Sequence, residues 1–99
     1  MTRAEALRRL REREPDLRKM GIARLSLFGS TARDEQRPDS DVDLAAVLAP
    51  DHAMGLLEFV GIQLQLAKLL GAEVDLVTEP ARKARLQMEI DRDRVIVFS

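Results

Sequence analysis

The chain has 99 residues, 45% hydrophobic and 33% charged, and its 16 basic and 17 acidic residues leave a net charge of −1. This composition is typical of a single globular domain, residues 1–99, and it excludes attraction to nucleic acid or anionic membranes through net charge. Cysteine, tryptophan and tyrosine are absent, which excludes disulfides, thiolate metal sites and most aromatic stacking platforms. No apolar run is long enough to span a membrane, and the charged first residues lack the apolar core of a signal peptide. We therefore expect a cytoplasmic protein that neither enters a membrane nor binds nucleic acid directly.

The first segment predicts a helix followed by a short turn. Thr2 can cap a helix with Glu5 three residues later, and Pro15 should interrupt that helix before a second short turn that ends near Gly21. The outer face of this helix is basic, through Arg8, Arg9, Arg11 and Arg13. A solvated surface or a contact to a partner would both account for these arginines.

Two strands and a short helix should come next. Ile22–Phe28 is rich in branched and apolar residues, which predicts a first strand ending at Gly29. Ser30 or Thr31 can cap a short helix that runs to about residue 36, and a polar loop then leads to a second strand, Val42–Leu48.

The second half predicts two more helices and two more strands. Asp51 can cap a long helix that ends at Leu70, before Gly71, and Glu73–Thr78 should form the third strand. Pro80 should start a charged helix, and a last strand should span residues 95–98.

The long helix from Met54 to Leu70 carries more apolar residues than one sheet face can cover. They occupy about two thirds of its circumference, whereas a helix packed on one layer needs a narrower stripe. The remaining apolar surface could meet another helix of this domain or a partner protein. The same helix could support homo- or hetero-oligomers.

Three aspartates lie on predicted strand faces, at Asp41, Asp43 and Asp75. Side chains alternate along a strand, so Asp41 and Asp43 share one face and repel each other unless a cation lies between them. Carboxylate oxygens are the ligands that Mg²⁺ or Mn²⁺ prefers. A calcium loop does not fit, because its sixth position would be Leu44 instead of glycine and its twelfth Pro50 instead of glutamate. Acids at a strand entrance with no ligand role remain the plain alternative.

A glycine-serine turn precedes the aspartates by ten residues. Gly29 lets a phosphate approach the backbone closely, Ser30 and the following amides can receive its oxygens, and Arg33 and Arg37 could neutralise a leaving pyrophosphate. Two Mg²⁺ ions held by the three aspartates would support in-line transfer at an α-phosphate of a nucleotide, with Asp75 also helping to accept a proton.

These segments resemble a known signature. Residues 27–30, ten residues, residues 41–44 and then residues 74–77 are similar to the nucleotidyltransferase motif of the DNA polymerase β superfamily, and most closely to the minimal nucleotidyltransferases that pair with HEPN ribonuclease toxins. The resemblance implies an α/β (α+β) fold, with a small mixed sheet of about four strands flanked by helices. It also implies magnesium and an antitoxin that transfers AMP from ATP to a tyrosine of its HEPN toxin.

Two alternatives stay open. The chain could be a non-catalytic antitoxin that acts by tight binding, or it could be a small-molecule nucleotidyltransferase, of the kind that modifies aminoglycosides, completed by a second subunit. The residues do not identify the acceptor.

Overall fold

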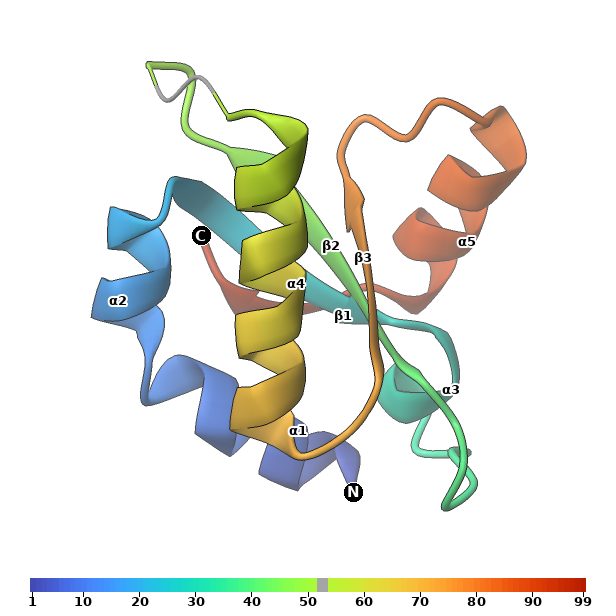
Figure 1. The fold of residues 1–99 in the computed structure, drawn as a ribbon. Helices are drawn as coiled ribbons and strands as arrows, with labels where there is room; N and C mark the ends of the chain where they lie inside the picture. Colours follow the sequence, from blue (N-terminus) through green and yellow to red (C-terminus); the bar gives the residue numbers. More distant parts are fainter. Residues whose placement is uncertain (52–53) are drawn as a thin grey trace.

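The structure is a computed structural model, and it describes residues 1–51 and 54–99. Figure 1 shows helices packed around a central sheet. The elements in chain order are α1 (Arg3–Arg11), α2 (Glu14–Lys19), β1 (Ile22–Phe28), α3 (Gly29–Ala32), β2 (Val42–Leu48), α4 (Leu56–Leu70), β3 (Val74–Thr78), α5 (Ala84–Asp93) and β4 (Val95–Phe98).

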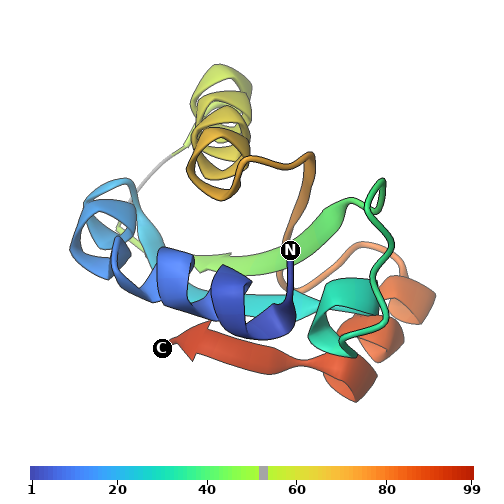
Figure 2. The ribbon, with the colours of Figure 1, turned by 90° about the horizontal axis from the view of Figure 1, so that it is seen from below.

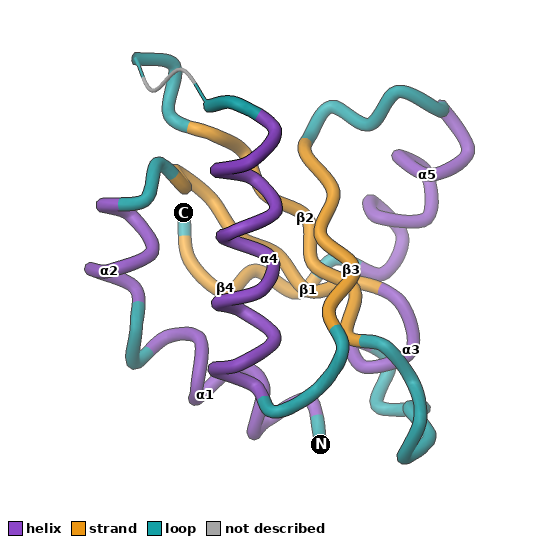
Figure 3. The backbone as a smooth tube through the Cα atoms, viewed as in Figure 1, coloured by secondary structure: helices purple, strands orange, loops and turns teal. Residues whose placement is uncertain are grey.

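The four strands form one mixed sheet in the order β3-β2-β1-β4, which can be followed in Figure 3. β1 pairs antiparallel with β2 and with β4, whereas β2 and β3 pair in parallel. The parallel pair requires a crossover, and α4 provides it. The predicted fold class, a four-stranded mixed sheet flanked by helices, is confirmed.

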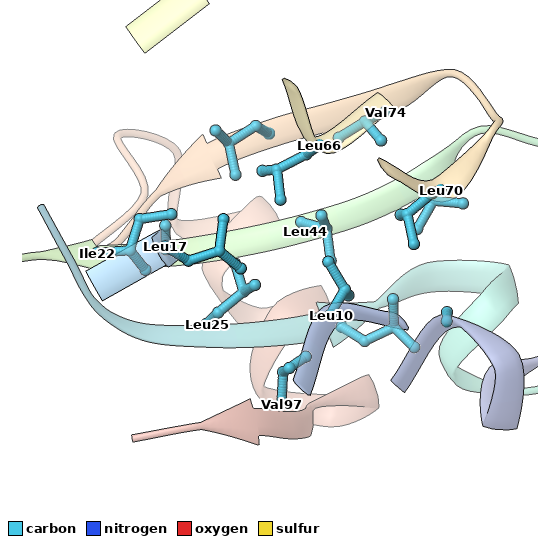
Figure 4. Close-up of a cluster of buried hydrophobic side chains, with 14 of the residues drawn as sticks. Leu10, Leu17, Ile22, Leu25, Leu44, Leu66, Leu70, Val74 and Val97 are labelled. Carbon is cyan, nitrogen blue, oxygen red and sulfur yellow. The ribbon is translucent and has the colours of Figure 1, made fainter. Parts of the chain in front are cut away.

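Helices cover both faces of the sheet, but unequally (Figure 2). On one face α1, α2 and α4 enclose the main core, where Leu10, Leu25, Leu44 and Leu66 are fully buried (Figure 4). On the other face a smaller cluster joins Phe28 and Ala45 of the sheet to Ile90 of α5, and α3 lies beside α5. The second face therefore leaves part of the sheet open near the start of β2 and β3.

Three helix starts differ from prediction. α3 comprises only Gly29–Ala32, and neither Ser30 nor Thr31 caps it, because Phe28 occupies the N-cap position. α4 begins at Leu56 after Gly55, with no side-chain cap, instead of at Asp51. Residues 52 and 53 of the expected helix lie outside the described residues. α5 begins at Ala84 instead of at Pro80. A residue that can cap a helix marks a helix start only where tertiary packing favours a helix. The local sequence does not encode that packing.

The basic face of α1 is not simply solvated. Arg9 donates to the carbonyl of Leu70, at the end of α4, over 2.8 Å, and Arg11 donates to the carbonyl of Val97 in β4 over 3.0 Å. These bonds give a donor to one carbonyl at a helix end and to another on an edge strand, two places where intrachain backbone partners are scarce. The arginines thus attach α1 to distant parts of the chain.

The apolar excess of α4 is exposed. Leu56, Leu57 and Leu64 are 78%, 88% and 64% exposed, and Val60 is also open to solvent. No other helix of the described residues covers these four side chains, so of the two alternatives, a contact with another helix of this domain is excluded for them. We call residues 56, 57, 60 and 64 the α4 stripe. No helix of residues 1–51 or 54–99 combines the length and apolar character needed to cross a membrane.

Candidate active site

Strand pairing brings two of the predicted aspartates together. In the parallel register of β2 and β3, Asp43 lies directly opposite Asp75, and in the antiparallel register Asp43 also lies opposite Phe28 at the end of β1. Directly opposed residues of paired strands point to the same face, so the two carboxylates stand side by side. Asp41, just before β2, is exposed at the entrance.

This arrangement makes Asp43 difficult to ionise. Partial burial, and next the negative charges of Asp75 and Asp41, raise the pKa of Asp43 from 3.8 to about 6. The positive charge of Arg33 opposes the shift, and Glu89 of α5 adds to it. A carboxylate that is costly to charge on a shared face is typical of a site that works with a cation.

Gly29 is required where it stands. Its φ is +74°, a left-handed conformation that favours glycine, and a Cβ atom at this position would lie only 2.2 Å from Oδ2 of Asp43. The turn therefore passes directly against the carboxylate. Ser30, the next residue, is half-buried in α3, and its carbonyl oxygen accepts a hydrogen bond from the backbone N–H of Glu35 over 2.9 Å.

The two predicted arginines have different surroundings. Arg33 Nη1 donates to Asp93, the last residue of α5, over 2.6 Å, and its Nε lies 3.6 Å from Glu35. Arg37 is exposed in the loop before β2, where its amide donates to the hydroxyl of Ser40 over 2.9 Å. The positive charge of Arg33 acts on Asp43, whereas Arg37 belongs to the turn that leads into Asp41.

Two acidic residues near this site were missed by the sequence analysis. The negative charge of Glu89 raises the pKa of Asp43. Asp93 forms an ion pair with Arg33, and the side chain of Asp93 is only 5% exposed. Both lie in a helix whose mixed charges resemble an ordinary solvated surface. Nothing in the spacing could have indicated that Asp93 contacts a residue 60 positions earlier in the chain.

The donor set fits a hard divalent cation. Among the described residues, no group of three or more His, Cys, Asp or Glu side chains is close enough as placed to hold a metal ion. The pair Asp43 and Asp75 nevertheless supplies oxygen ligands, with Asp41 beside it, and a cation between them would remove the repulsion that raises the pKa of Asp43. A separate cleft of about 620 Å³ between α2 and α4 lies on the other face of the sheet and contains none of the predicted site residues.

Comparison with known proteins identifies the fold and its chemistry. Residues 4–97 match the model of the nucleotidyltransferase domain family. The chain belongs to this family. The carboxylates and the Gly29 turn lie within the matched residues.

The individual relatives that match this chain include small members of the family. The protein adenylyltransferase MntA of Thermococcus cleftensis is 33% identical over 80% of this chain and 78% of its own length. A solved structure described as a minimal nucleotidyltransferase is 36% identical, with a TM-score of 0.75, over 96% of this chain and 95% of the other. A chain from the complex of a tri-AMPylated Shewanella oneidensis HEPN toxin with its MNT antitoxin shares the fold, with a TM-score of 0.61 and 18% identity over 87% of this chain and 69% of that one. The chain is thus similar to the minimal nucleotidyltransferases of HEPN-MNT pairs.

Proposed function

We propose that this chain is a single-domain antitoxin that transfers AMP from ATP to a tyrosine of a partner HEPN toxin. The observation that carries the proposal is the register pair of Asp43 and Asp75 directly beside the Gly29 turn. The adenylyltransferase relative supports the reaction class, and the toxin complex of the same fold supports the acceptor. Because the described residues fold around a single four-stranded sheet, the acceptor would bring its own binding surface.

The residues have distinct roles in the proposed reaction. Asp41, Asp43 and Asp75 would hold two Mg²⁺ ions, or Mn²⁺ in their place, which supply charge neutralisation at the phosphates and lower the pKa of the attacking hydroxyl. Gly29 allows the triphosphate to approach the backbone, and Ser30 can donate to a phosphate oxygen. Arg33 and Arg37 would neutralise the charge of the leaving pyrophosphate.

The transfer step balances without a further reactant. The tyrosine oxygen forms a bond to the α-phosphorus of ATP, and the bond from that phosphorus to the bridging oxygen breaks. The electron pair of that bond leaves with pyrophosphate. Asp75 helps to accept the hydroxyl proton, which then passes to solvent.

Intact mass measurement of the toxin tests this proposal. We expect the toxin encoded beside this chain to gain one or more AMP units when mixed with the chain, ATP and MgCl₂. Asp43→Asn should abolish the gain, whereas Asp39→Asn, in the exposed loop ahead of the site, should not. Unchanged toxin mass, with both proteins folded and the complex formed, would refute the proposal.

The α4 stripe favours a second candidate, inhibition by binding alone. Its exposed leucines lie on the helix that covers the opposite face of the sheet from Asp43, so a toxin could dock there without using the carboxylates. In that case Asp41→Asn with Asp43→Asn would still protect cells, whereas Leu57→Glu would abolish both binding and protection. Loss of protection by the aspartate variant with toxin binding intact would exclude this candidate.

A further inference from the structure

Asp93 is a buried carboxylate that neither the family signature nor the proposed reaction uses. It is the last residue of α5, where the end of the helix lies beside α3 (Figure 1). Arg33 Nη1 donates to one of its oxygens over 2.6 Å, and Arg92 donates to it over 3.0 and 3.3 Å. A negative charge at a helix C-terminus works against the helix dipole, so the helix itself gains nothing from an aspartate there.

The anchored arginine lies at the site. Arg33 is the C-cap residue of α3, which starts at Gly29 and packs against β2 and α5, and a Cβ atom on Gly29 would meet the carboxylate of Asp43. Asp93 uses Nη1, and Glu35 lies near Nε at 3.6 Å. A guanidinium carries five N–H donors in one plane, so the Nη2 edge still has donors available for a phosphate.

We propose that Asp93 is a positioning residue that holds Arg33 in the orientation in which it receives the phosphates of the bound nucleotide. The inference rests on the proposed function, because it assigns Asp93 to the nucleotide step of that reaction. An arginine that is partly exposed, as Arg33 is, would otherwise lose side-chain freedom each time a nucleotide binds. The buried anchor removes that freedom in advance.

A purely structural role for Asp93 is the competing explanation. A second ion pair lies at the end of α5, where the C-cap residue Arg94 pairs with Glu79 of the segment after β3 and donates to the Ser26 hydroxyl over 2.9 Å. This pair also attaches α5 to the sheet, but neither Arg94 nor Glu79 contacts Arg33 or belongs to α3. Glu79→Gln is therefore a matched control for Asp93→Asn, since each variant removes one buried carboxylate that holds α5.

The affinity of the chain for a fluorescent ATP analogue, measured with MgCl₂ and without toxin, reports nucleotide binding directly. We expect Asp93→Asn to raise the dissociation constant about tenfold, the scale of one charge-assisted hydrogen bond. Asp93→Glu should restore the constant to within about threefold of the wild type, and Glu79→Gln should leave it unchanged even where it lowers the melting temperature. The double variant Arg33→Gln with Asp93→Asn should bind no more weakly than Arg33→Gln alone.

Three results would overturn the inference. One is equal weakening by Asp93→Asn and Glu79→Gln, and another is independent, multiplying effects of Asp93→Asn and Arg33→Gln. If Asp93→Asn does not fold, Arg33→Lys tests the same anchor, because lysine keeps the charge but has no planar fork to orient. Affinity of Arg33→Lys equal to the wild type is then the third contradicting result.

Failure of the inference can be told apart from failure of the proposed function. A wild-type chain that binds nucleotide but modifies no toxin would refute the proposed function and leave the role of Asp93 intact. A wild-type chain that binds no nucleotide would overturn both.

Discussion

Replacing Asp43 by asparagine should stabilise the metal-free protein at neutral pH. Burial and the neighbouring aspartates raise the pKa of Asp43 from 3.8 to about 6, so the folded state favours the protonated form. Its favourable contribution is fully present below pH 3.8 and is lost as the pH rises through about 6. At about 1.36 kcal/mol for each unit of pKa, the rise from 3.8 to about 6 corresponds to about 3 kcal/mol. Because the side chain is only partly buried and solvent screens its charge, we expect about 1–2 kcal/mol.

Thermal unfolding in EDTA, followed by circular dichroism between pH 4 and 8, measures this effect. Asp43→Asn should melt above the wild type at pH 8, by about 4–8 °C for each kcal/mol, and the gap should close towards pH 4. Adding MgCl₂ should raise the melting temperature of the wild type and have little effect on the variant. Asp39→Asn, which changes an exposed aspartate in the loop before β2, should stay within about 0.5 kcal/mol of the wild type throughout. A gap that is absent at pH 8, or equal at every pH, would refute the electrostatic reasoning.

Three further substitutions test the packing, each by urea denaturation. Gly29→Ala should destabilise the chain by about 1–3 kcal/mol and abolish AMP transfer, because the added Cβ would meet the Asp43 carboxylate at 2.2 Å. Stability equal to the wild type would contradict this prediction. Gly61→Ala should stabilise by about 0.5–1 kcal/mol, because its Cβ meets nothing within 4 Å and alanine favours a helix; a loss of stability would disprove it. Leu66→Ala should cost about 2–5 kcal/mol, whereas Leu57→Ala, 88% exposed in the isolated chain, should cost under about 0.5; equal costs would show that the burial pattern is wrong.

The strands were predictable from the sequence because their signals are local. Ile22–Phe28 and Val42–Leu48 begin and end as expected, since alternation and branched side chains mark a strand wherever it lies in the sheet. The start of α4 was not predictable in the same way. Asp51 has the chemistry of a cap, but α4 begins five residues later, after Gly55, because tertiary packing overrides a single local signal.

The core of the site was predictable for a similar reason, and its surroundings were not. The spacing of Asp41 and Asp43 places both on one face, and a third acid on a strand suggests a partner, which the register pair of Asp43 and Asp75 provides. The bond between Arg33 and Asp93 joins residues 60 positions apart, and only the folded chain brings them together. Local sequence therefore encodes which carboxylates come together, whereas the residues that surround them depend on the tertiary structure.

The unequal faces of the sheet explain how this small domain can tolerate a strained site. The main core lies on the face of α1, α2 and α4, where Leu10, Leu44 and Leu66 are fully buried. The opposite face holds only a small apolar cluster, and there Asp43 and Asp75 repel each other beside a turn that admits no side chain at Gly29. Because the stabilising contacts and the mutually repelling carboxylates lie on different faces, loss of Asp43 should improve stability and remove activity together. Loss of Leu66 should lower stability without any direct effect on the carboxylates.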